Sequence, residues 1–212
     1  ENDVGNLFRL IAERNRLFAE NYPFDLHHSD RIILKPDLSY KQQLYIMLLL
    51  ASNLDIFKTV RSELTTEFEK VAYQALKCYL PNDSMVKSFG KNSDYTGNAL
   101  TKIRELAKDM FINVKENELA HISENNMQER GVDVLGWIPF KDRIPNFLVI
   151  LGQCACGKDW YNKQNETRRY EHYLEFYRQK PLHSLFIPFA IINPGIGFYE
   201  GDEINNETLL FE

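Results

Sequence analysis

The chain has 212 residues, of which 44% are hydrophobic and 26% are charged, as is typical of a soluble globular protein. The formal net charge is −5, which excludes a protein that holds nucleic acid through overall positive charge, so any contact with DNA must come from a local patch or a partner. No apolar run reaches the roughly 18 residues that a membrane-spanning helix needs, so we expect no membrane association.

The cysteines and the first residues favour a cytoplasmic location. Cys78, Cys154 and Cys156 are an odd number and too few for a disulfide framework. The first residues lack a basic region followed by an apolar block, so no secretory signal is expected. The Cys154 and Cys156 pair is only a weak zinc signal, because no second pair of ligands follows at a suitable spacing and His27 and His28 lie far away in the sequence.

Two helices are predicted in the first 60 residues. An amphipathic pattern over residues 3–21 predicts the first, which Pro23 ends. The second is predicted over residues 39–54 with Ser39 as its cap. Because residues 44–51 are apolar nearly all round, this helix is expected to be deeply buried.

Two more helices are predicted over residues 64–80 and 99–111. Thr65 or Thr66 is the expected cap of the third helix, and Pro81 follows its end.

From residue 131 the apolar runs become short and rich in β-branched residues, so strands are expected to begin there. Strands are predicted over residues 132–138, 147–155 and 184–192, the last confined by Pro188 to an edge or a bulge. Residues 158–180 are interpreted as loop and helix. The order helix, strand, strand, helix, strand predicts a mixed α/β fold.

The third helix carries two glutamates with different surroundings. On a helical wheel Glu69 falls at the border of the apolar arc, whereas Glu67 lies outside it, about 200° away. A carboxylate drawn towards the core needs a cation or a hydrogen-bond donor. The alternative is that Glu69 is a boundary residue that reaches water.

Two polar residues lie in or at the predicted strands. Asp133 is flanked by valines, although aspartate is disfavoured in strands, and Gln153 follows a run of apolar residues. Each taken alone has a structural explanation, a turn after Gly131 for Asp133 and a strand end for Gln153.

Three residues follow one another in the chain: an inward helical carboxylate (Glu69), a strand aspartate (Asp133) and, about twenty residues later, a strand amide (Gln153). Taken together, they resemble the pattern of the PD-(D/E)xK nuclease superfamily. The resemblance covers residues 64–192 and implies a restriction-endonuclease-like core with a central mixed sheet flanked by helices. On this interpretation residues 1–60 form a helical N-terminal extension and residues 61–212 the nuclease-like α/β core.

The resemblance also implies a metal site. Asp133, the amide oxygen of Gln153 and the backbone carbonyl of Cys154 would bind Mg²⁺ (or Mn²⁺), because oxygen ligands suit these ions. The glutamine is a neutral variant of the usual acid, and Glu69 would restore part of the missing charge. The pattern expects a catalytic lysine where the chain has Ala155, and the nearest ammonium group is that of Lys158. Lys158 is therefore the expected catalytic cation, which would orient the attacking water or stabilise the phosphate.

Residues 158–180 combine an excess of basic residues with interleaved tyrosines and a tryptophan. Lys163, Arg168 and Arg169 could bind phosphates while the aromatic residues stack on bases. A solvated helix face would show a similar mixture.

The leading hypothesis is a metal-dependent DNA endonuclease domain, which the resemblance places in a bacterial restriction or antiphage defence system. A second hypothesis is a catalytically inactive, nuclease-like module that binds nucleic acid or a partner protein. A third is a helical interaction protein.

Overall fold

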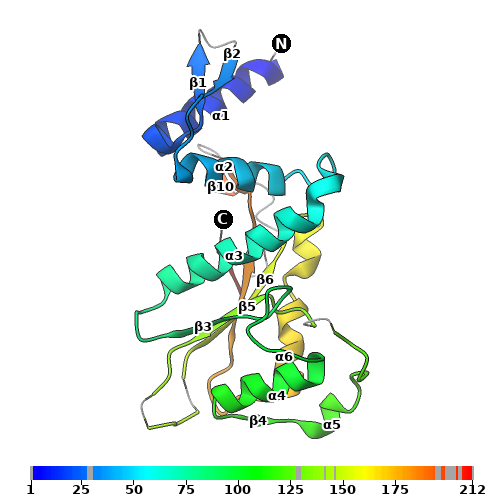
Figure 1. The fold of residues 1–212 in the computed structure, drawn as a ribbon. Coiled ribbons are helices and arrows are strands. Elements are labelled where there is room, and N and C mark those ends of the chain that lie inside the picture. Colours follow the sequence, from blue (N-terminus) through cyan, green and yellow to red (C-terminus); the bar gives the residue numbers. More distant parts are fainter. Residues whose placement is uncertain are drawn as a thin grey trace.

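The computed structural model describes residues 2–27, 31–127, 130–140, 142–145, 147–193, 197–198, 204 and 207–211. Within these ranges the chain forms six α-helices and a five-stranded mixed central sheet (Figure 1). The mixed α/β class predicted from the sequence is confirmed. No described helix is both long and apolar enough to cross a bilayer.

The N-terminal part contains a hairpin that the sequence analysis did not predict. Its elements are α1 (Asn2–Phe18), the 3-10 turn η1 (Ala19–Asn21), β1 (Phe24–His27), β2 (Arg31–Leu34) and α2 (Tyr40–Ala51). The two strands pair with each other in antiparallel fashion. In Figure 1 they lie with α1 at one end of the molecule, and α2 lies between them and α3.

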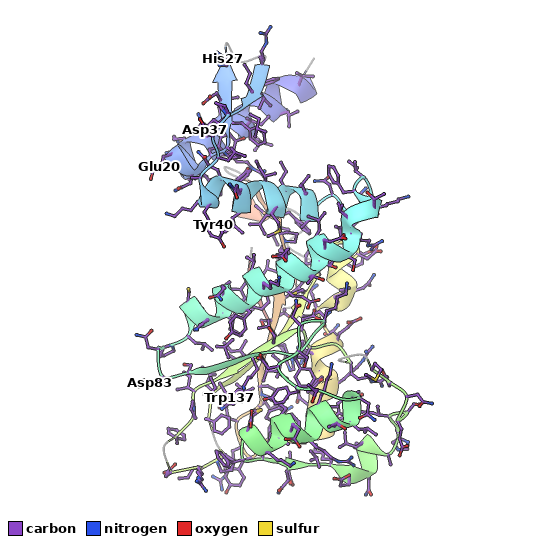
Figure 2. All side chains as sticks on the ribbon, in the orientation of Figure 1. Glu20, His27, Asp37, Tyr40, Asp83 and Trp137 are labelled. Atoms are coloured by element: carbon purple, nitrogen blue, oxygen red, sulfur yellow. The ribbon has the colours of Figure 1, made fainter. Side chains whose placement is uncertain are left out.

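The predicted deep burial of the second helix is wrong. Ser39 caps α2 as expected, in a reciprocal capping box with Gln42, but the buried residues of the helix are Gln42 and Ala51. Leu49 is 37% exposed, and Tyr40 is 80% exposed and extends from the start of the helix (Figure 2). The helix contacts α3 and η1, and these contacts cover only part of its apolar surface.

Helix α3 (Arg61–Tyr79) begins earlier than predicted. Thr65 and Thr66 are not its caps, because both hydroxyls donate to the carbonyl of Ser62 inside the helix. The 3-10 turn η2 (Lys58–Val60) leads directly into α3, and no side chain caps its N-terminus.

The sheet combines antiparallel and parallel strands. Its strand order is β11-β8-β6-β5-β3, with β3 (Met85–Ser88), β5 (Val134–Trp137), β6 (Val149–Cys154), β8 (Leu182–Phe186) and β11 (Thr208–Phe211). β5 pairs antiparallel with β3 and β6, whereas β8 pairs parallel with β6 and β11.

Two strand predictions need correction. β1, β2 and β3 precede residue 131, where strands were expected to begin. The third predicted strand is observed as β8, which lies inside the sheet and not at its edge. It ends at Phe186, so the N–H that Pro188 lacks is not needed in the strand ladder.

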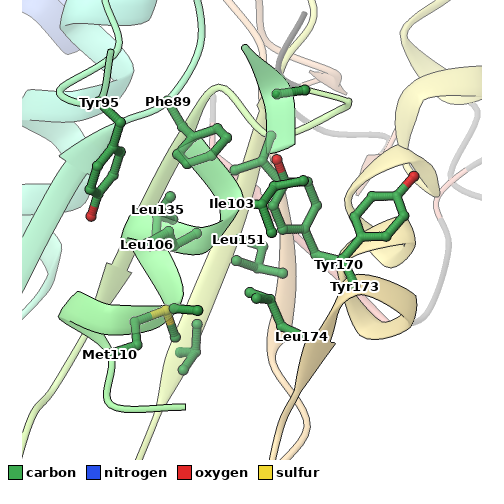
Figure 3. Close-up of a cluster of buried hydrophobic side chains, with 14 of the residues drawn as sticks. Phe89, Tyr95, Ile103, Leu106, Met110, Leu135, Leu151, Tyr170, Tyr173 and Leu174 are labelled. Carbon is green, nitrogen blue, oxygen red and sulfur yellow. The ribbon is translucent and has the colours of Figure 1, made fainter. Parts of the chain in front are cut away.

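Helices cover both faces of the sheet. Val134 and Ile150 pack against α3, while Leu135 and Leu151 pack against α4 (Ala99–Asp109) and α6 (Tyr170–Tyr173) in the cluster of Figure 3. This alternation is the period-2 pattern of strands buried on both faces. The close approach of α3 requires Gly136, because a Cβ there would lie 2.6 Å from Leu80 Cδ1.

Short elements complete the fold. These are β4 (Asn113–Val114), α5 (Glu116–Leu119), η3 (Trp160–Lys163), η4 (Glu166–Arg169), β7 (Leu174–Glu175), β9 (Ile192–Asn193) and β10 (Gly197–Phe198). η3, η4, α6 and β7 form the crossover from β6 to β8, where loop and helix were predicted.

Candidate active site

Asp133 lies immediately before β5 and is held by three neighbouring segments. Its N–H donates to the carbonyl of Gly152 at 2.8 Å, and its carbonyl accepts from the N–H groups of Phe89 and Gly90 at 2.7 and 3.0 Å. Its Oδ2 accepts from the N–H of Cys154 at 2.7 Å. The backbone therefore fixes this carboxylate where β3, β5 and β6 meet.

Glu69 reaches the same place from α3. Its Oε2 accepts from the N–H of Lys91 at 3.0 Å. An ideal Cβ on Gly90 would lie 2.8 Å from Glu69 Oε2 and 2.9 Å from Asp133 Oδ1. Both carboxylates thus face the space above the Cα of Gly90, which a side chain would fill.

The predicted phase of α3 is confirmed. Glu69 is buried, whereas Glu67 is exposed and its Oε1 accepts from Lys70 Nζ at 2.6 Å. The helical periodicity therefore distinguished the glutamate that lies in the site from the one that pairs on the surface.

Gln153 brings a neutral oxygen next to Asp133. The pairing of Val134 with Gly152 makes Asp133 and Gln153 neighbours across the ends of the two strands. Gln153 Oε1 is buried and has no hydrogen-bond partner among the described residues. A buried acceptor without a protein partner is costly, so this oxygen is available to a water molecule or to a bound cation.

These residues line one cavity of about 610 Å³. It brings together five of the residues predicted from the sequence: Glu69, Asp133, Gln153, Cys154 and Lys163.

Lys158 does not line this cavity. It is exposed and borders a smaller neighbouring cavity of about 90 Å³ beside the end of α2. Ala155, at the position where the superfamily pattern expects lysine, is fully buried in an apolar cluster with Trp160 and Leu185. The turn at Gly157 thus leads Lys158 away from the carboxylates.

Other cations line the cavity instead. Lys163, from η3, is joined by Arg61, Lys91 and Lys102, which the sequence analysis did not select. Lys91 Nζ also donates to Thr65 Oγ1 at 3.0 Å. The position of Lys91 directly after Gly90 is a sequence feature that could have identified it as a site residue. Arg61 and Lys102 have no distinguishing pattern in the sequence.

The two predicted phosphate-binding arginines lie outside the cavity lining. Arg168 Nη2 forms an ion pair with Glu207 Oε2 at 2.8 Å, and its Nε donates to Asn165 Oδ1 at 3.2 Å. Arg169 is exposed. Of the three predicted phosphate ligands, Lys163 alone lies beside the carboxylates.

The cysteines beside the carboxylates remain protonated thiols at neutral pH. Burial, followed by the negative charges of Asp133 and Glu69, raises the pKa of Cys154 well above its usual range. Burial also raises the pKa of Cys156 to about 12, although the charge of Lys163 opposes the shift. Because thiolates are the form that binds metal, either side chain would have to lose its proton before it could bind a metal ion.

In the described ranges, no three histidine, cysteine, aspartate or glutamate side chains cluster closely enough to hold a metal ion by themselves. A divalent cation at this site would therefore need oxygen ligands from amide or carbonyl groups besides Glu69 and Asp133. Gln153 Oε1 is a suitable donor.

Comparison with protein-family models, with curated proteins and with solved structures finds no match to the chain. The function is therefore inferred from the geometry of the cavity.

Proposed function

We propose that this chain is a magnesium-dependent DNA nuclease domain. The observation that carries the proposal is the convergence in one cavity of two carboxylates, Glu69 and Asp133, with the amide oxygen of Gln153, which has no partner in the part of the chain that the structure describes. Hard oxygen ligands of this kind suit Mg²⁺ or Mn²⁺.

The three residues have separate roles in this proposal. Asp133 and Gln153 would hold the metal ion, and Glu69 would add the negative charge that the neutral amide does not supply. A bound divalent cation supplies charge neutralisation at the phosphate and an activated water near neutral pH. The backbone hydrogen bonds of Asp133 and Glu69 hold both carboxylates in position before substrate arrives.

The fold is consistent with the PD-(D/E)xK resemblance. Asp133 and Gln153 lie at the ends of neighbouring antiparallel strands, β5 and β6, and Glu69 lies on the preceding helix α3. The sheet is mixed and is flanked by helices. A role in a restriction or antiphage defence system is a further proposal, based on this resemblance.

In this proposal Lys163 supplies the cation for which the sequence suggested Lys158. Lys163 lines the cavity and lies close enough to Cys154 and Cys156 for its charge to oppose the rise in the pKa of both thiols. An ammonium group there can stabilise the negative charge that develops on the phosphate.

The test is cleavage of supercoiled and linear DNA by the purified protein with and without Mg²⁺ or Mn²⁺. Asp133→Asn should abolish metal-dependent cleavage and keep the fold, because an amide oxygen can still accept from the N–H of Cys154. If Asp133→Asn cleaves DNA as fast as the parent protein, the proposed site is wrong.

One observation favours a second candidate, a nuclease-like module that binds nucleic acid or a partner protein without cutting. Ala155 is fully buried among apolar residues, and Lys158 lies outside the cavity, so the lysine position of the family pattern is lost. Retained DNA binding without cleavage in either metal would favour this candidate.

A further inference from the structure

The groups proposed to be catalytic lie on the floor of the cavity. Glu69, Asp133 and Gln153 are only 9%, 6% and 5% exposed. The cavity has a volume of about 610 Å³, which is within the range of pockets that enclose small molecules. One flexible strand can place both a phosphate and an unpaired base in a space of this size, whereas a duplex, whose bases are paired and stacked, could offer it only the backbone.

The walls are more positive than the protein as a whole. Among the described residues, four cations, Arg61, Lys91, Lys102 and Lys163, line the cavity with three carboxylates, although the chain carries a net charge of −5. The cations come from α3, the segment after β3, α4 and η3, so they surround the floor on several sides. A positive groove that follows the backbone is typical of sites for single strands.

The lining also offers an apolar surface for a base. Met127 lines the cavity and is 63% exposed. A thioether is polarizable and makes favourable contacts with aromatic rings. Trp160 also lines the cavity but is buried, so Met127 is the more accessible of the two.

We propose that the substrate of this cavity is single-stranded DNA, including gaps and frayed ends of a duplex. One strand would enter between the cations, place a phosphodiester group over Asp133 and Gln153, and rest a base against Met127. This inference rests on the proposed function, because it takes the same cavity as the DNA site.

Binding tests this inference independently of catalysis. A labelled oligonucleotide would be titrated with the protein by fluorescence anisotropy in Ca²⁺, both as a single strand and within a blunt duplex. We expect the single strand to bind at least about tenfold more tightly, because its unpaired bases can contact the lining while the bases of a duplex cannot. Equal or tighter binding of the duplex, or tighter binding of the matching RNA strand, would overturn the inference.

A pair of variants on α4 tests whether the cavity is responsible. Lys102→Ala should weaken single-strand binding by about threefold to tenfold and reduce its salt dependence. Lys108→Ala is the matched control, because Lys108 pairs with Glu105 on the exposed side of the same helix. Equal effects of the two substitutions would place the strand elsewhere and refute the inference.

Cleavage separates the two proposals. With Mg²⁺ or Mn²⁺ we expect cuts in single strands and in gapped duplexes, within the gap, and none inside an intact duplex. Comparable cutting of intact duplex would refute the single-strand inference and leave the nuclease proposal standing. Selective single-strand binding without cleavage would refute the nuclease proposal and leave the inference about the ligand standing.

Discussion

Gly90→Ala is the sharpest test of the carboxylate geometry. The added Cβ would lie 2.8 Å from Glu69 Oε2 and 2.9 Å from Asp133 Oδ1, closer than real Cβ atoms approach other heavy atoms. The φ angle of Gly90 is not in the positive region, so the substitution adds no backbone strain there. The Gly90 N–H can still donate to the carbonyl of Asp133, so we expect the fold to persist.

The size of the effect follows from how the two carboxylates are held. Asp133 Oδ2 accepts from a backbone N–H at 2.7 Å and Glu69 Oε2 from another at 3.0 Å, so neither can move without weakening a hydrogen bond. A hydrogen bond to a charged group contributes about 1.5–3 kcal/mol. Displacing one carboxylate should therefore raise the Mg²⁺ concentration needed for half-maximal cleavage by about tenfold to a hundredfold.

The assay is single-turnover cleavage over a Mg²⁺ titration, with thermal unfolding measured in parallel. Gly5→Ala is a matched control, since Gly5 does not line the cavity and a Cβ there would meet no atom within 4 Å. An unchanged Mg²⁺ requirement in a folded Gly90→Ala protein would refute the inference that the two carboxylates act together.

Four further predictions use the same cavity. Gln153→Glu should lower the Mg²⁺ concentration needed for binding, because it adds a negative charge beside Asp133, and an unchanged titration would place Gln153 outside the metal site. Glu69→Gln should slow cleavage, while Glu67→Gln on the exposed side of α3 should not; equal rates of the two variants would contradict this role. Lys163→Ala should slow single-turnover cleavage by roughly a hundredfold, whereas Lys158→Ala should cleave at close to the parent rate. A larger loss of rate in Lys158→Ala than in Lys163→Ala would return the catalytic role to Lys158. At pH 8 iodoacetamide should modify the exposed Cys78 and spare Cys154 and Cys156, because the raised pKa values of these two thiols keep thiolate scarce until much higher pH. Fast labelling of all three cysteines, measured by mass spectrometry, would contradict the burial of the site.

Local patterns were sufficient for several parts of the site. The 3.6-residue period placed Glu69, and not Glu67, towards the core. An aspartate between two valines marked Asp133, and the polar end of an apolar run marked Gln153. The capping role of Ser39 was equally readable, because a cap depends only on its neighbours in sequence.

Other parts depend on tertiary contacts that a local pattern does not contain. Strand β3 is only four residues long and lacks a clear alternation, so only its pairing with β5 identifies it. The apolar run of α2 predicted burial, but burial depends on what packs around a helix. Arg61 and Lys102 reach the cavity from separate helices, a proximity that sequence spacing does not encode.

The short connection between β5 and β6 has a consequence for the order in which the site is assembled. Residues 138–148 link these strands, so bringing Asp133 beside Gln153 closes a short loop at low entropic cost. Pairing β6 with β8 must instead wait for the long crossover that carries Lys163, and Glu69 comes from a helix still further away in the sequence. During folding the β5–β6 pair can therefore form first, and during partial opening it can persist after the crossover detaches. Hydrogen exchange should then be slower at the amides of β5 and β6 than in η3, so the chain would lose the arrangement of the proposed site before it loses the β5–β6 pair.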